Sequence, residues 1–236
     1  MQGLERVRLI FRCPNELKDL LPVPVPAAEG LPGWLKSMPA EAFSALLGRN
    51  EDTAKRCPPL LDAMTTGFLM PLMCDVRVED GEFSWDMELP AGRSVEFPRS
   101  PMSFHDPAQI SGAPFAEQDQ FIVKFHNPWA IEVPAGYSVL FTHPLNRHDL
   151  PFVTLTGLVN CDRFSHLGTH FPALWRDPKF KGVLPKGTPI AHCIPVKRES
   201  WDVEMATLDE AQSHDAQATL DAIRRARGVY RRRFRA

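Results

Sequence analysis

The chain has 236 residues, of which 44% are hydrophobic and 24% charged, an ordinary composition for a soluble globular protein. This length is enough for one well-buried core with room for a helical appendage. The formal net charge is −2, so the whole-chain charge predicts binding neither to a membrane nor to a nucleic acid. The longest apolar run, residues 67–74, is too short to cross a bilayer and contains a proline. The N-terminus has no secretory apolar region, so we expect a cytoplasmic protein.

Cysteine and proline usage narrows the fold class. The five cysteines are odd in number, widely spaced and without a Cys-x-x-Cys pair, which favours reduced thiols over disulfides or a zinc site. The 23 prolines are spread from residue 14 to residue 195. Because proline is poorly tolerated inside helices, this distribution predicts a loop-rich β body with many edges and turns.

The first quarter of the chain mixes extended and helical patterns. Apolar and basic residues alternate up to residue 12, which predicts an edge strand. The Pro-Val-Pro-Val-Pro sequence of residues 22–26 cannot be helical and predicts an extended arm. Residues 33–36 begin a predicted helical stretch, which residues 40–47 continue up to Gly48.

The middle of the chain predicts strands that are separated by tight turns. Residues 57–68 have the pattern of a turn, a helix and a second turn, and a strand follows through residue 78. Asp80–Gly81 predicts a hairpin turn that leads into residues 83–87. Three more strands are predicted at residues 121–125, 129–133 and 137–141. We therefore expect a mainly β body of about ten short strands, arranged as a small barrel or a jelly-roll-like fold.

From about residue 207 the pattern changes to that of a helix. Acidic residues come first, at Asp209 and Glu210, and arginines come last, which is the order that a helix dipole favours. A solvated helix end accounts for the arginine run, and contact with phosphate or nucleic acid is the alternative. We predict one β-rich domain over residues 1–205, with its proline-rich arm, and a basic C-terminal helix over residues 206–236.

Residues 134–195 carry the most informative motifs. Gly157-Leu-Val-Asn-Cys-Asp-Arg-Phe164 resembles the uracil-binding hairpin of the trimeric dUTPase and dCTP deaminase superfamily. Lys186-Gly-Thr-Pro-Ile-Ala-His192 resembles a later turn and strand of the same superfamily. The resemblance implies a β-clip fold and a homo-oligomer, with a trimer favoured.

Two substitutions distinguish this motif from that of the enzymes. In dUTPases the position that matches Asn160 is an aspartate that helps to activate the attacking water, and an amide cannot act as a general base near neutral pH. The aromatic residue under the deoxyribose is usually tyrosine, and Phe164 keeps the ring without the hydroxyl. Of the phosphate-binding motifs, only Asn146–Arg147 is a partial match. The resemblance thus favours binding over dUTP hydrolysis and leaves open whether the protein is an enzyme.

A second resemblance covers most residues from 57 to 201. Segments such as CPPLLDAMTTGF, FHNPWAIEVPAGYSVLFTHPLNR and KGTPIAHCIPVKRESW resemble an uncharacterised family found in bacteria and their phages. This resemblance implies no known activity. It keeps a phage-related structural or assembly protein as an alternative.

The histidines raise the alternative of a cupin-like non-haem iron oxygenase. Such a site needs two histidines and one carboxylate on a single face. His105 and Asp106 are adjacent, so on a strand they would point to opposite faces, and His143 does not have the usual motif spacing. The spacing therefore predicts no metal site and no cofactor, and histidines that bond to turn backbone are the favoured explanation. His105, Asp106 and His143 are the candidate ligands if the alternative holds.

We predict a ligand pocket at the hairpin of residues 157–164, facing the turn at residues 146–147. Its residues are Asn146, Arg147, Gly157, Asn160, Asp162 and Phe164. The glycine-led turn exposes backbone groups that can read a planar base edge, Phe164 offers an apolar ring face, and Arg147 offers a planar fork to an anion. The hypothesis is a protein that binds a small polar ligand of the nucleotide kind.

Overall fold

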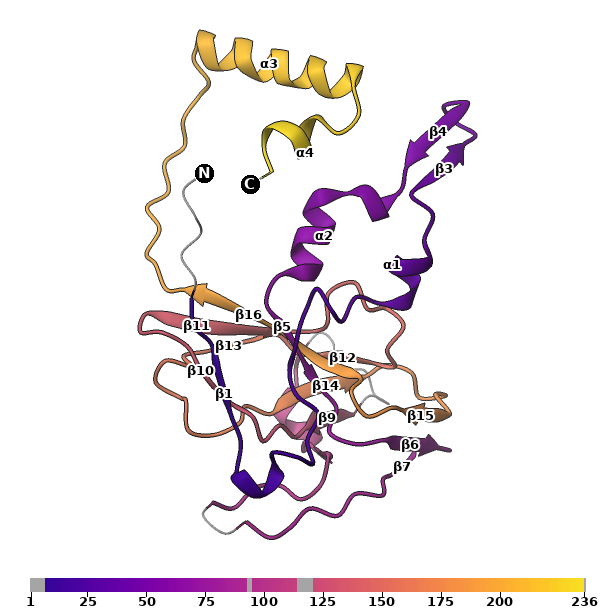
Figure 1. Ribbon diagram of the computed structural model, residues 1–236, viewed down its shortest axis with the longest axis vertical. Coiled ribbons are helices and arrows are strands. Elements are labelled where there is room, and N and C mark those ends of the chain that lie inside the picture. Colours follow the sequence, from indigo (N-terminus) through magenta and orange to yellow (C-terminus); the bar gives the residue numbers. More distant parts are fainter. Residues whose placement is uncertain (1–6, 93–94, 114–120, 236) are drawn as a thin grey trace. The chain divides into compact units, whose positions relative to one another are not determined.

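The computed structural model describes residues 7–92, 95–113 and 121–235, so residues 1–6 of the predicted N-terminal strand lie outside the described residues. The chain divides by its contacts into two compact units. One comprises residues 1–36 and 64–198, and the other comprises residues 37–63 and 199–236. In Figure 1, every labelled strand except β3 and β4 belongs to the first unit.

The elements are short strands and a few helices. The described strands are β1 (Ile10–Arg12), β2 (Val25–Pro26), β3 (Glu41–Ser44), β4 (Arg49–Asp52), β5 (Phe68–Pro71), β6 (Val76–Glu79), β7 (Glu82–Ser84), β8 (Met102–Phe104), β9 (Ile122–Phe125), β10 (Ala130–Glu132), β11 (Tyr137–Thr142), β12 (Phe152–Thr154), β13 (Gly157–Val159), β14 (Phe171–Trp175), β15 (Gly182–Leu184) and β16 (Pro189–Lys197). The helices are α1 (Gly33–Ser37), α2 (Pro58–Thr65), α3 (Glu210–Arg225) and α4 (Val229–Arg233), with 3-10 turns at Asn15–Leu17, Ala54–Arg56 and Pro107–Ile110. The prediction of a mainly β protein with a helical C-terminal extension is confirmed.

Two antiparallel sheets form most of the first unit. The larger has the strand order β13-β11-β16-β5-β2, and the second has the order β12-β14-β9-β8. Smaller sheets pair β15-β6-β7 and β1-β10. None of the sheets closes into a barrel within the described residues. The small barrel, one of the predicted alternatives, is therefore not the observed architecture.

Aromatic side chains join the two larger sheets in one core. Phe141 of β11 and Phe171 of β14 are both buried, and their ring centroids lie 5.3 Å apart. Within the second sheet region, Phe125 and Phe152 are fully buried with centroids 4.7 Å apart. Each such side chain contributes about 1.5–3 kcal/mol through burial alone.

Strand β16 is the central strand of the larger sheet, and the motif at residues 186–192 runs into it. Its residues Ile190 to Cys193 are all buried, because β11 and β5 pair along its two edges and the core covers its faces. Pro195 lies beyond the last residue that pairs with β5. The missing N–H of this proline therefore removes no ladder bond on that edge.

The Asp80–Gly81 hairpin and the three strands predicted in the middle of the chain are present. Asp80 and Gly81 have φ angles of 52° and 82°, which is the left-handed pair that a tight hairpin between β6 and β7 needs. Strands β9 and β10 fall within the predicted ranges, and β11 extends one residue beyond its range, to Thr142. Among the described residues, no helix is long and apolar enough to cross a membrane.

The helix predicted through residues 40–47 is wrong. This segment forms the strand β3, a turn and the start of a hairpin with β4 in the second unit. Gly48, at φ 63°, takes the left-handed conformation of the turn. The Arg56 guanidinium bonds the carboxylates of Glu41 and Asp52, which face each other across the hairpin, at 2.6 and 2.9 Å. These non-local bonds override the modest local helix propensity of the segment.

Candidate functional site

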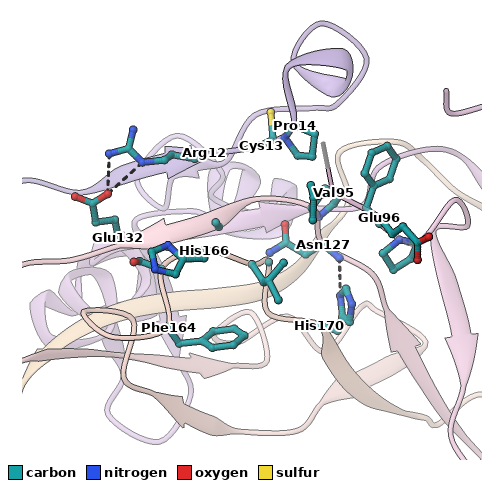
Figure 2. A pocket seen from close by; sticks show the side chains of 17 residues that line it. Arg12, Cys13, Pro14, Val95, Glu96, Asn127, Glu132, Phe164, His166 and His170 are labelled. Atoms are coloured by element: carbon teal, nitrogen blue, oxygen red, sulfur yellow. Dashed lines mark hydrogen bonds and ion pairs between the residues drawn. The ribbon is translucent and has the colours of Figure 1, made fainter. Parts of the chain in front are cut away.

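The first unit contains a pocket of about 700 Å³. Four segments line it, at residues 12–14, 95–98, 127–132 and 164–170. Figure 2 shows the side chains, with dashed lines for the Arg12–Glu132 pair and for the bond between Asn127 and His170. The volume is in the range of small-molecule sites, and most of the lining is apolar.

The ring of Phe164 is presented to this pocket by a turn that follows β13. The carbonyl oxygen of Asn160 accepts the backbone N–H of Arg163 at 2.9 Å and that of Phe164 at 2.8 Å. These two hydrogen bonds to the Asn160 carbonyl oxygen close the turn. The Phe164 side chain remains 45% exposed, so one apolar face is available in the pocket.

Asn127 and Gly168 hold the two walls of the pocket together. The Asn127 amide donates to the carbonyl oxygens of Trp129 and Thr169, and its own oxygen accepts the Trp129 N–H at 3.0 Å. Gly168 forms a bridge with Ala130, and a Cβ at position 168 would lie 1.8 Å from the Asn127 carbonyl oxygen. The close approach therefore requires glycine at this position.

His170 is an uncharged hydrogen-bond donor in the pocket. The backbone N–H of Asn127 donates to its Nδ1 at 3.1 Å, so the ring proton is on Nε2. Burial, with the neighbouring His126 as a smaller cause, lowers the pKa of His170 to about 4. The ring is therefore neutral near pH 7 and can donate from Nε2.

His126 supports His170 from behind. Its ring centroid lies 5.0 Å from that of His170. Its Nδ1 donates to the Ser100 carbonyl oxygen at 2.8 Å, and its Nε2 lies 2.9 Å from the Ser103 hydroxyl. Burial lowers the pKa of His126, which keeps this ring neutral as well.

Arg12 and Glu132 add charge to the edge of the pocket. Arg12 Nη2 donates to Glu132 Oε2 at 2.7 Å, across the β1–β10 pair. Both side chains are exposed, so the pair is screened by solvent and stabilises the fold little. With Glu96, which also lines the pocket, the charged side chains of the described lining are one guanidinium and two carboxylates.

The structure brings Asn160 and Asp162 together, in a cluster that stabilises the predicted hairpin. Asp162 accepts bonds from the Arg198 guanidinium and from the Gly136 N–H, and Asn160 accepts the Ser138 hydroxyl at 2.8 Å. The Arg198 bonds lower the pKa of Asp162 to about 2. The side chain of Asp162 is only 7% exposed. Both residues therefore fix the strand ends that precede Phe164.

Asn146 and Arg147 lie at a different place. Asn146 takes the left-handed conformation of a turn, at φ 58°. Arg147 lines a second pocket, of about 560 Å³, and its guanidinium binds both carboxylate oxygens of Asp149. Gly157 is exposed on the edge strand β13, opposite Phe141. Of the six predicted residues, the 700 Å³ pocket thus contains Phe164.

Two of the three candidate oxygenase ligands, His143 and Asp106, have other partners. His143 Nε2 donates to the Arg147 carbonyl oxygen at 2.8 Å, and its Nδ1 accepts the Thr154 N–H at 3.3 Å. Asp106 caps the 3-10 turn at residues 107–110 through the Ala108 N–H. No group of three or more histidine, cysteine or acidic side chains that could hold a metal ion occurs in the described part of the chain.

Sequence reasoning missed His170, Asn127 and Gly168 as residues of the pocket. Asn127 was visible only as part of an Asn-Pro break between two predicted strands. The histidines of the segment 166–170 have i, i+4 spacing, but the segment is irregular rather than helical. The segments that contain Asn127 and His170 are joined by the bridge between Ala130 and Gly168, which no local sequence pattern encodes.

The comparisons add little to this geometry. No protein-family model and no curated protein matches the chain. Among solved structures, the chain is similar to a mutant dUTPase of Staphylococcus bacteriophage 80alpha, with dUpNHpp. The two are 15% identical with a TM-score of 0.27, over 60% of this chain and 90% of that chain. The chain is a mainly β protein whose first unit contains a pocket.

Proposed function

We propose that this protein binds a small molecule with a planar ring and a polar edge, and that the 700 Å³ pocket is the site. A nucleoside or nucleotide is the ligand class that we favour. The observation that carries the proposal is the exposed face of Phe164 in the same pocket as the neutral donor His170. A planar ring can pack on the first while an acceptor oxygen or nitrogen meets the second.

The uncharged histidines of the pocket favour a ligand with a neutral ring, whereas the charged side chains of the described lining are one cation, Arg12, and two carboxylates, Glu96 and Glu132. His170 and His126 are uncharged, so a neutral base that enters the pocket does not leave a buried charge without a partner. Arg12 already bonds Glu132, so it could meet an anionic substituent only at the exposed edge, where that group would stay partly hydrated. Gly157, Asn160 and Asp162 act in this proposal by building the hairpin that presents Phe164.

Binding, rather than hydrolysis, is the function we assign. The Asn160 amide oxygen accepts the Ser138 hydroxyl, and an amide cannot take a proton from water near neutral pH. The homotrimer inferred from the dUTPase resemblance stays part of the proposal, and in it Asn146 and Arg147 would contact a ligand held by another copy. Light scattering that gives the mass of a single 26.6 kDa chain at micromolar concentration would contradict the oligomer.

The proposal is tested by thermal shift with dUTP, dCTP, deoxyuridine and the matching ribonucleosides, with Fe²⁺ plus 2-oxoglutarate as a separate condition. A ligand that binds only the folded state raises the midpoint, by an amount that grows with its concentration. We expect a shift with at least one nucleoside or nucleotide that is lost in Phe164→Ala. Phe43→Ala, which removes an exposed phenylalanine outside the pocket, serves as the control. A shift only with iron and 2-oxoglutarate would assign the oxygenase instead.

A further inference from the structure

The basic and acidic residues are unevenly distributed along the chain, although its net charge is near zero. Seven of the 27 lysines and arginines lie in residues 224–236, which contain no acidic residue. This segment therefore carries +7, while residues 1–223, with 20 basic and 29 acidic residues, carry −9. A charge run of this density is an electrostatic feature in its own right.

The segment is folded within the second unit. Helix α3 ends at Arg225, and Gly228, at φ 71°, makes the left-handed turn into α4. Val229 is buried and holds α4 in place. The arginines are therefore displayed on a structured turn of helix rather than on a free tail, which lowers the entropy lost when they bind a partner.

Four of the seven arginines are used within the unit. Arg227 approaches Glu41 at 3.6 Å, and Arg235 pairs with Asp62 at 2.5 Å. Arg232 donates to the Arg227 carbonyl oxygen at 2.9 Å, and Arg224 lies 4.0 Å from Asp221. These contacts fix the orientation of the segment.

The other three arginines are not used within the described residues of the unit. Arg225, Arg231 and Arg233 are exposed and have no ion pair or hydrogen bond from their side chains within residues 7–92, 95–113 and 121–235. Two aromatic rings accompany them. Tyr230 and Phe234 are 44% and 52% exposed, with ring centroids 6.3 Å apart.

We propose that the exposed side chains of residues 225–234, namely Arg225, Tyr230, Arg231, Arg233 and Phe234, bind single-stranded nucleic acid. Arginine forks meet phosphate oxygens, and exposed aromatic rings stack on unpaired bases, which is the chemistry of single-strand binding without strong sequence preference. A duplex offers the same phosphates but no free base faces. The aromatic pair is therefore what favours single strands over duplexes.

The full chain is tested by fluorescence anisotropy with labelled oligo(dT), oligo(U) and a duplex of equal length. We expect single strands to bind more tightly than the duplex, with affinity that falls as salt rises from about 50 to 200 mM. In Arg225→Ala/Arg231→Ala/Arg233→Ala the log–log salt slope should fall by about 2, because each single-strand phosphate contact contributes about 0.7. Arg49→Ala, at an arginine already paired with Glu51, is the matched control and should leave the slope unchanged.

A second variant separates stacking from charge. Tyr230→Ala/Phe234→Ala keeps all seven arginines, and we expect it to weaken single-strand binding about tenfold or more with the salt slope retained. Circular dichroism checks that both variants keep the wild-type helix content. Three outcomes would overturn the proposal: no binding at low salt, equal affinity for duplex and single strand that survives the aromatic variant, or tighter binding to anionic vesicles or an acidic peptide.

Discussion

At the scale of single residues, a charged hydrogen-bond partner decides whether a buried group stays ionised. Asp162 is nearly inaccessible but stays ionised, because the Arg198 guanidinium and the Gly136 N–H both donate to it. His170 has no such charged partner, so burial keeps it neutral instead. The first residue is a fixed anion of the scaffold and the second a neutral donor of the pocket.

The Asp162–Arg198 pair gives a prediction about stability. Asp162→Asn removes the carboxylate and leaves Arg198 with a weaker partner, so we expect the melting temperature at pH 7 to fall by several degrees. Because the pKa of Asp162 is lowered in the folded state, its contribution is present above the unfolded value near 3.8 and is lost as the pH falls towards about 2.

Asp149→Asn is the matched control for this pair. Asp149 is also bound by an arginine, Arg147, but its side chain is far more exposed, and surface pairs contribute little. Melting curves of both variants at pH 7 and pH 3 make the comparison. An equal loss for the two variants, or a loss for Asp162→Asn that persists at pH 3 undiminished, would contradict the assigned role.

At the scale of elements, the pocket depends on one close approach between two loops. Gly168→Ala places a methyl group 1.8 Å from the Asn127 carbonyl oxygen, so one wall must move. We expect this substitution to lower the free energy of unfolding by about 1–3 kcal/mol, as overpacking does. Gly157→Ala, where nothing lies within 4 Å of the added Cβ, should change it by less than about 0.5 kcal/mol.

Urea unfolding of both glycine variants provides the measurement. Because the displaced wall carries His170, Gly168→Ala should also lose the ligand-induced thermal shift, while Gly157→Ala should keep it. A Gly168→Ala protein with wild-type stability would show that the two loops are not in contact.

The elements that sequence patterns predict well are those with local causes. The Asp80–Gly81 hairpin follows from two left-handed turn residues, and β9, β10 and β11 follow from short apolar runs between turn signals. The segment 40–47 was predicted wrongly because its strand pairing depends on Arg56, which bonds both sides of the hairpin from outside it. Long-range bonds of this kind leave no periodicity in the sequence.

At the scale of the whole molecule, neutral histidines make stability depend on pH. Burial lowers the pKa of four histidines, namely His126, His143, His170 and His192. In the unfolded chain these rings take up protons below about pH 6.5. The unfolded state therefore gains protons that the folded state does not, and stability falls as the pH drops through this range.

The expected result is a lower free energy of unfolding at pH 5.0 than at pH 7.5, by about 1–2 kcal/mol from His170 alone. Urea titrations at the two pH values test this. The carboxylates with lowered pKa, Asp149 and Asp162, lose their contribution only at more acidic pH and do not mask the effect. Equal stability at the two pH values would contradict the neutral histidines.

The candidate site was only partly predictable because it is assembled from distant segments. The hairpin motif drew attention to Phe164, whose turn is local. Its partners in the pocket come from residues 12–14, 95–98 and 127–132, which meet only after the sheets have paired. Arg198, which fixes Asp162, lies 36 residues further along the chain and was visible in the sequence only as part of a charge run.

Calorimetric titration of the wild-type chain, Phe164→Ala and Phe43→Ala with the nucleoside or nucleotide that gives the largest thermal shift tests the central claim most directly. We predict saturable binding to the wild type and to Phe43→Ala, and binding at least about tenfold weaker to Phe164→Ala, since aromatic stacking contributes about 1–3 kcal/mol per base. Equal affinity for all three proteins, or no heat with any nucleoside or nucleotide, would contradict the assignment of this pocket as the ligand site.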